Sequence, residues 1–137
     1  MKFNKLIPEL SVSSLRDSLN FYVGILGFKV EYEREESRFA FLSFQGIQIM
    51  LEEVNDTWKT GVLEHPFGRG VNFQIEVKSI KPLFKSLKRS KYPIFQELAD
   101  NWYRKGNLLL GNREFLVQDP DGYLIRFCEN LGSKPVK

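Results

Sequence analysis

The chain has 137 residues, of which 42% are hydrophobic and 14% aromatic, and its formal net charge is +3. This composition excludes a disordered chain and favours a globular protein with a packed core, and the length allows one domain or two small fused modules. No compact run of Lys and Arg is interleaved with stacking aromatics, so we expect no nucleic-acid partner. One cysteine cannot form an intrachain disulfide or a thiolate metal site, and no apolar run could cross a bilayer. We therefore expect a cytoplasmic protein without a membrane partner.

The first half of the chain predicts one helix among four strands. The predicted elements are a strand over 6–12, a helix over 15–26, and strands over 28–32, 39–44 and 47–52. Ser13 or Ser14 can cap the helix, and Gly27 is a typical residue at a helix C-terminus. Gln45-Gly46 indicates a hairpin turn between the last two strands.

The second half predicts the same order after an irregular connector. The predicted elements are a strand over 71–77, a helix over 80–87, a long loop or broken strand over 96–110, a hairpin over 113–128 and a frayed tail over 132–137. Ser79 can cap this helix. In the hairpin, Asp119-Pro120-Asp121-Gly122 has the composition of a tight turn.

The two halves repeat one another at fixed offsets. Apolar residues of the first strand and helix recur 65 positions later, so that Val12, Leu15, Leu19 and Tyr22 match Val77, Ile80, Phe84 and Leu87. Hairpin residues recur 76 positions later, so that Gly46, Ile49 and Leu51 match Gly122, Ile125 and Phe127. We therefore predict the α+β class, with two pseudo-symmetric βαβββ modules in one domain over 1–137. Module one spans about 1–56, the connector about 57–69 and module two about 70–130.

These features resemble the vicinal oxygen chelate superfamily, which includes glyoxalase I, extradiol dioxygenases, and fosfomycin- and bleomycin-resistance proteins. The resemblance rests on Leu15-x-x-Ser18-Leu19-x-Phe21-Tyr22-x-x-x-Leu26-Gly27-Phe28 and on Phe115-x-x-x-Asp119-Pro120-x-Gly122. It implies that the two modules form a curved mixed sheet with a concave ligand cleft. The motifs say little about activity, because the fold hosts many.

Metal-dependent members of this family take one ligand from the first and one from the last strand of each module. The corresponding residues here are Ile7, Met50, Asn72 and Arg126. Isoleucine cannot ligate, methionine is a soft ligand, and arginine is a permanent cation without an acceptor. We therefore expect no metal, no cofactor and no catalytic residue, which puts glyoxalase or dioxygenase activity in doubt. The alternative is a metal-dependent lyase or dioxygenase with a shifted site that uses Glu9, Glu52, Glu114 or His65.

This departure fits the bleomycin-resistance branch, which resembles this chain and binds its drug without chemistry. The resemblance implies a non-catalytic antibiotic-binding protein, a homodimer that sequesters a flat polar antibiotic or metabolite in clefts between subunits. An unrelated metabolite is a third possibility. Pro8 is either the hinge of an exchanged N-terminal strand or a proline of an edge strand or bulge.

Strand alternation predicts which residues face the cleft. They are an arginine, two amides, a carboxylate and a methionine, namely Arg126, Asn72, Gln74, Glu9 and Met50. Arg126 either binds a planar acceptor or pairs internally with Glu9 or Glu76. Loop residues Trp102 and Tyr103 either stack on a flat ligand or pack as a lid, and Phe39 and Phe41 are similar candidates.

Overall fold

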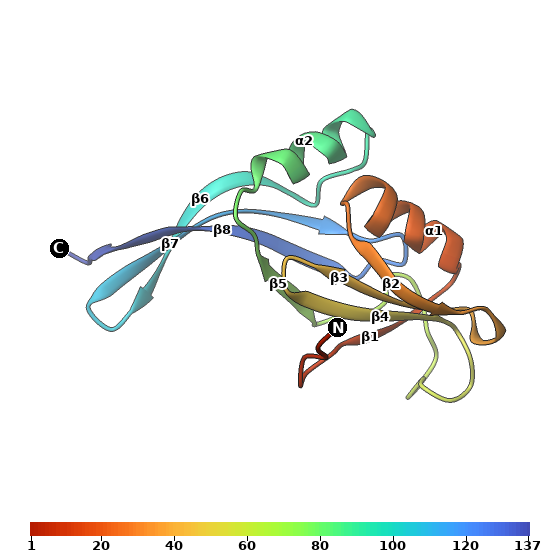
Figure 1. The fold of residues 1–137 in the computed structure, drawn as a ribbon. Helices are drawn as coiled ribbons and strands as arrows, with labels where there is room; N and C mark the ends of the chain where they lie inside the picture. Colours follow the sequence, from red (N-terminus) through yellow and green to blue (C-terminus); the bar gives the residue numbers. More distant parts are fainter. The chain divides into compact units, whose positions relative to one another are not determined.

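A computed structural model describes all 137 residues (Figure 1). The chain forms two compact units. The first unit comprises Met1–Arg69 and Asp119–Tyr123, and the second comprises Gly70–Gln118 and Leu124–Lys137. Each unit contains one four-stranded mixed sheet. No helix in the structure combines the length and the apolar character that a membrane span requires.

The first unit has the strand order β1-β4-β3-β2. Its elements are β1 (Glu9–Val12), α1 (Leu15–Leu19), η1 (Asn20–Ile25), β2 (Lys29–Arg34), η2 (Glu35–Ser37), β3 (Phe39–Phe44) and β4 (Ile47–Glu53). β1 runs parallel to β4, whereas the β2–β3 and β3–β4 pairs are antiparallel. β1 begins at Glu9 and not at Leu6, because Pro8 has no backbone N–H; its carbonyl still accepts from the Met50 N–H at 2.9 Å.

Helix α1 begins and continues in two different ways. The Ser14 Oγ accepts from the Asp17 N–H at 3.2 Å, which confirms the predicted cap. The predicted helix over 15–26 then widens into the π-helical segment η1, in which the adjacent residues Phe21 and Tyr22 are both buried.

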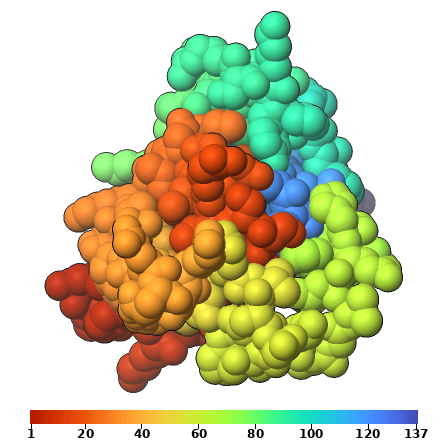
Figure 2. Space-filling view, turned by 90° about the vertical axis from the view of Figure 1, so that its right-hand side faces the viewer, coloured from red at the N-terminus to blue at the C-terminus, as the bar shows by residue number.

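The predicted turn at Gln45-Gly46 is confirmed by left-handed φ values of 46° and 87°. The connector after β4 has no regular element and lies on the surface, coloured yellow to lime in Figure 2.

The turn Asp119–Tyr123 belongs to the first unit. Asp119 is 3% exposed; its Oδ2 accepts from the Tyr22 hydroxyl at 2.8 Å, and its Oδ1 accepts from the N–H groups of Asp121 and Tyr123 at 2.9 Å. Burial raises the pKa of the Asp119 carboxyl to about 6. Gly122 has φ +97°, and a Cβ there would lie 2.5 Å from the Pro66 Cβ, so the turn requires glycine twice over.

The second unit has the equivalent strand order β5-β8-β7-β6. Its elements are β5 (Asn72–Glu76), α2 (Lys81–Arg89), β6 (Gln96–Lys105), β7 (Leu108–Gln118) and β8 (Leu124–Pro135). β5 runs parallel to β8, and α2 lies over one face of this sheet (Figure 1). The core beneath α2 contains Ile75, Leu87, Phe115 and Phe127, all buried as alternation predicts.

Of the two alternatives for residues 96–110, the broken strand is confirmed and the long loop is wrong. Strand β6 pairs with β7 from Gln96 to Lys105 with a register shift between Gln96 and Ala99, and β7 begins at Leu108. A further prediction about the second unit was wrong. The tail over 132–137 is not frayed as a whole, because β8 continues to Pro135 opposite Leu108. In both places polar sequences of low strand propensity are held by pairing with a neighbouring strand.

The internal repeat is visible in the hydrogen bonds at the two helix starts. The Glu53 Oε2 accepts from the Leu15 N–H at 2.9 Å, and the Glu129 Oε1 accepts from the Ile80 N–H at the same distance. These pairs are related by the offsets of 76 and 65 found in the sequence. The Glu129 contact also corrects the predicted Ser79 cap, because no side chain at the N-cap of α2 makes the capping hydrogen bond. The α+β class with two similar βαβββ modules is thus confirmed.

Candidate ligand-binding site

The second unit has a hollow of about 570 Å³ on its sheet. We call it the polar hollow; its lining residues are Gln74, Glu76, Tyr103, Leu110, Gly111, Asn112, Arg126, Asn130, Gly132 and Ser133. All four strands contribute, and Gln74 lies directly opposite Arg126 in the parallel β5–β8 register. The apolar neighbours Ile75 and Phe127 are buried, so the lining side chains of these two strands point away from the core.

A buried carboxylate, Glu114 on β7, adjoins this hollow and is 2% exposed. The Tyr103 hydroxyl donates to its Oε1, and the Asn101 Nδ2 donates to the same oxygen at 3.0 Å. The hydrogen bond to Glu114, followed by burial, raises the pKa of Tyr103. Tyr103 therefore remains a protonated donor at neutral pH, and it fixes the orientation of the carboxylate.

Arg126 pairs with Glu114, a partner that the internal-pairing alternative with Glu9 or Glu76 did not include. The Arg126 Nη1 lies 3.8 Å from the Glu114 Oε2, which is close enough for an ion pair but too long for a hydrogen bond. The two residues are diagonal neighbours, since Glu114 is opposite Cys128 in the β7–β8 register. Sequence reasoning considered Glu114 only as a metal ligand, although alternation around Phe115 already placed it on the same sheet face.

Two polar atoms of this pair are buried without a hydrogen-bond partner. They are the Glu114 Oε2 and the Arg126 Nε. Burying such a group without a partner costs roughly 1–3 kcal/mol, and more when it is charged. A buried polar atom without a partner calls for an explanation, such as a bound water, ion or ligand. The pair therefore leaves one acceptor, the Glu114 Oε2, and one donor, the Arg126 Nε, for such a group.

Trp102 and Tyr103 lie on strand β6, so the predicted loop or lid position for them was wrong. As neighbours in a strand they point to opposite faces, and only Tyr103 lines the polar hollow. The Trp102 ring covers Gly111, where an added Cβ would lie 2.7 Å from ring atoms. The Trp102 ring also contacts Lys134, whose Nζ lies 3.9 Å from the centroid of the ring in a cation–π arrangement.

The remaining predicted residues are divided between the units. Asn72 is exposed on β5 of the second unit, two residues before Gln74. Glu9 and Met50 lie in the first unit, where they are register partners on β1 and β4. Burial, followed by repulsion from Glu52, raises the pKa of Glu9.

Phe39 and Phe41 on β3 are 1% and 0% exposed. The Phe41 ring stacks on Tyr32 at 5.1 Å and meets the Phe3 ring edge-on at 5.4 Å. The Arg34 guanidinium lies 3.9 Å from the Phe39 ring centroid. Their rings are thus occupied by neighbours of the first unit, and ligand contact for them stays a prediction.

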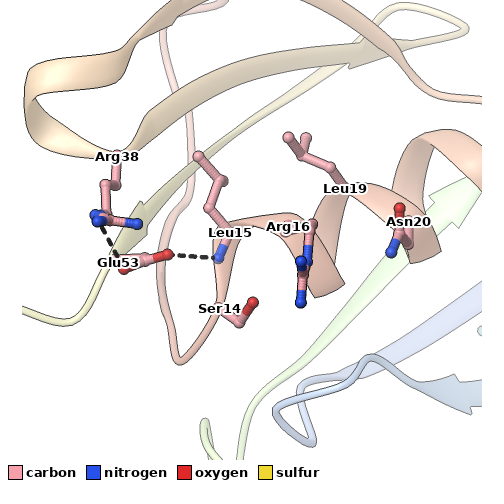
Figure 3. A pocket seen from close by; sticks show the side chains of 7 residues that line it. All are labelled: Ser14, Leu15, Arg16, Leu19, Asn20, Arg38 and Glu53. Carbon is pink, nitrogen blue, oxygen red and sulfur yellow. Dashed lines mark hydrogen bonds and ion pairs between the residues drawn. The ribbon is translucent and has the colours of Figure 1, made fainter.

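A second hollow, of about 580 Å³, lies at the start of α1 in the first unit (Figure 3). Its lining residues are Ser14, Leu15, Arg16, Leu19, Asn20, Arg38 and Glu53. The one carboxylate among them is already occupied: Glu53 accepts from the Leu15 N–H at 2.9 Å and lies 3.6 Å from the Arg38 Nε. The carboxylate of this hollow is thus used to cap the start of α1. We therefore favour the polar hollow as the candidate site.

The residues present do not fit a divalent metal. No group of three or more His, Cys, Asp or Glu side chains is arranged to hold an ion. In the polar hollow the guanidinium of Arg126 would repel one. The only histidine, His65, is exposed in the connector of the first unit.

Known proteins resemble this chain over nearly its whole length. Residues 5–127 match the model of the Glyoxalase/Bleomycin resistance protein/Dioxygenase superfamily. A bleomycin resistance protein from Geobacillus stearothermophilus is 30% identical over 138 residues, which cover 93% of this chain and 97% of the relative.

Solved structures show the same fold at lower identity. TioX from Micromonospora sp. ML1 has a TM-score of 0.73 at 19% identity, covering 94% of this chain and 100% of that chain. A lactoylglutathione lyase from Agrobacterium tumefaciens has a TM-score of 0.62 at 14% identity, covering 92% of each chain. At these identities the structures speak for the fold alone. With the family match and the full-length relative, the resemblance seen in the two sequence motifs is confirmed: this chain belongs to the glyoxalase/bleomycin resistance protein/dioxygenase superfamily.

Proposed function

We propose that this chain binds and sequesters a flat, polar antibiotic or metabolite of the bleomycin type and does not convert it. The observation that carries the proposal is the match to a bleomycin resistance protein over 93% of this chain. The chemistry of the polar hollow supports it, because the hollow offers amide, carboxylate and guanidinium groups that can orient a polar ligand but no set of metal ligands.

Within the proposed site, Arg126 is the residue that orients the ligand. Its side chain is 28% exposed, it lines the hollow, and its Nε has no acceptor. A guanidinium whose Nε–H is uncommitted suits a planar acceptor such as a carbonyl, carboxylate or conjugated ring nitrogen. Tyr103, 44% exposed, offers a ring on which a flat ligand can stack.

We further propose that the chain is a homodimer whose binding clefts are completed between subunits. In this arrangement the polar hollow supplies one wall of each cleft, and the N-terminal segment before β1 is the part exchanged. Light scattering coupled to size exclusion tests the oligomeric state. A mass of 16.0 kDa at all concentrations, which is that of one chain, would contradict this part of the proposal.

Binding is tested by thermal unfolding with and without bleomycin. A ligand that binds only the folded state stabilises it by about 2.7 kcal/mol at a hundredfold excess over Kd, so the midpoint should rise with concentration. The Arg126→Gln variant should lose most of this rise. The matched control is Arg104→Gln, which removes the same charge from an exposed position on β6 outside the lining. An equal rise in all three proteins would refute the role of Arg126, and no rise in any would refute bleomycin as the ligand.

A further inference from the structure

The two unpartnered atoms of the Glu114–Arg126 pair indicate which chemical group could bind between these residues. The Glu114 Oε2 can only accept a hydrogen bond, and the Arg126 Nε can only donate one. Both atoms are buried, and the Glu114 Oε2 lies 3.8 Å from the Arg126 Nη1. One small planar group with an acceptor beside a donor could therefore satisfy both residues together.

We infer that the polar hollow recognises the donor–acceptor edge of a primary carboxamide or an equivalent aminated heterocycle, held between Arg126 and Glu114. This inference rests on the proposed function and names the ligand group that the site takes. The carbonyl oxygen accepts from the Arg126 guanidinium, and the adjacent NH2 donates to the Glu114 Oε2. A neutral group suits the pair, because Arg126 and Glu114 carry opposite charges.

The same pair excludes simpler groups. A carboxylate would satisfy Arg126 but would place a negative charge beside Glu114, with Glu76 on the same lining. A ketone offers no donor, so the Glu114 Oε2 stays unpaired. An amidinium offers no acceptor and meets the charge of Arg126. Sites that leave their own polar groups unpaired discriminate strongly against such analogues.

Access to Glu114 depends on Tyr103. Glu114 is not itself among the lining residues. Tyr103 does line the hollow, and its hydroxyl donates a hydrogen bond to the Glu114 Oε1. Tyr103 lies on β6, the edge strand of the sheet, and is 44% exposed. The inference therefore includes an outward movement of the Tyr103 ring, which breaks its hydrogen bond to the Glu114 Oε1 and opens the Glu114–Arg126 pair to the carboxamide. Asn101, whose Nδ2 also donates to the Oε1, keeps the carboxylate in place.

Four isosteric fragments test the inference: benzamide, benzoate, acetophenone and benzamidine. Each is titrated into the full-length 15N-labelled protein, and affinities are taken from the backbone amide shifts of Asn112, Arg126 and Cys128. Benzamide should bind tightest, by about tenfold or more over each of the others, which corresponds to one missing hydrogen bond at a paired charge. In the Glu114→Gln variant, Arg126 loses its anionic partner, so benzoate should overtake benzamide.

The control is Glu97→Gln, which makes the same charge change at an exposed residue that pairs with Lys88. It should keep the wild-type ranking. The inference is overturned if benzoate binds the wild type more tightly than benzamide does. This comparison uses the wild type alone, so it does not depend on whether a variant folds. If bleomycin shifts these amide signals and benzamide does not, the inference fails but the proposed function stands. This is the result expected if only water binds between Glu114 and Arg126. If neither shifts them, both fail.

Discussion

The buried carboxyl of Asp119 makes folding of the first unit depend on pH. Its pKa is raised from the ordinary 3.8 to about 6, first by burial, against the hydrogen bond from Tyr22. Each pH unit between folded and unfolded pKa corresponds to about 1.4 kcal/mol, so the ionised group costs the folded state about 3 kcal/mol at neutral pH. Because the folded protein holds the proton more tightly, this contribution to stability is complete below pH 3.8 and is lost as the pH rises through about 6.

The substitution Asp119→Asn removes this dependence. An asparagine oxygen can still accept from the N–H groups of Asp121 and Tyr123, and its amide can donate to the Tyr22 hydroxyl. Urea unfolding of both proteins should be followed across the range from pH 4 to 8. The free energy of unfolding of the wild type, relative to the variant, should fall by about 2.4 kcal/mol over this range, because pH 4 lies close to the unfolded pKa and the contribution is not yet complete there.

A second variant locates the titrating group. Tyr22→Phe removes a hydrogen bond that lowers the pKa of Asp119, so the midpoint of the pH dependence should move above about 6. The reasoning is refuted if the free energy of unfolding of the wild type minus that of Asp119→Asn does not change with pH, or if this signed difference rises as the pH rises.

Two further predictions compare matched substitutions, each checked by equilibrium unfolding. Ser14→Ala should cost about 1 kcal/mol because Ser14 caps α1, whereas Ser79→Ala should be neutral; the opposite order would contradict the capping by Glu129. Gly24→Ala should stabilise by about 0.5–1 kcal/mol, because the site is open and exposed, and Gly111→Ala should destabilise by about 1–3 kcal/mol through its collision with Trp102. Equal effects of the two glycine substitutions would show that Trp102 does not lie over Gly111.

Periodicity predicted most of the fold because burial alternates regularly in it. Ile75, Phe127, Leu83 and Leu87 are buried as the pattern predicts. The repeat offsets reappear in the strand register, where Leu10 opposite Leu51 matches Ile75 opposite Phe127, and at both helix starts. For β6 the sequence left a long loop and a broken strand open as alternatives, because its polar residues carry no alternation. Its structure comes from pairing with β7, a contact between residues that local sequence does not specify.

The candidate site was predicted only in part. Gln74 and Arg126 were predicted to share a face, and they are register partners. The partner of Arg126 was missed because Glu114 was considered only as a metal ligand, although the predicted hairpin and its alternation place Glu114 on the face of Arg126. Tyr103 was predicted as a candidate for the wrong reason, since it lies in a strand and not in a loop.

Titration calorimetry with bleomycin, followed by mass spectrometry of the recovered ligand, tests the central claim most directly. The proposed function predicts saturable binding with one site per chain, loss of that binding in Arg126→Gln, and a ligand recovered unchanged. No saturable heat would contradict bleomycin binding, and a ligand recovered in altered form would contradict binding without chemistry.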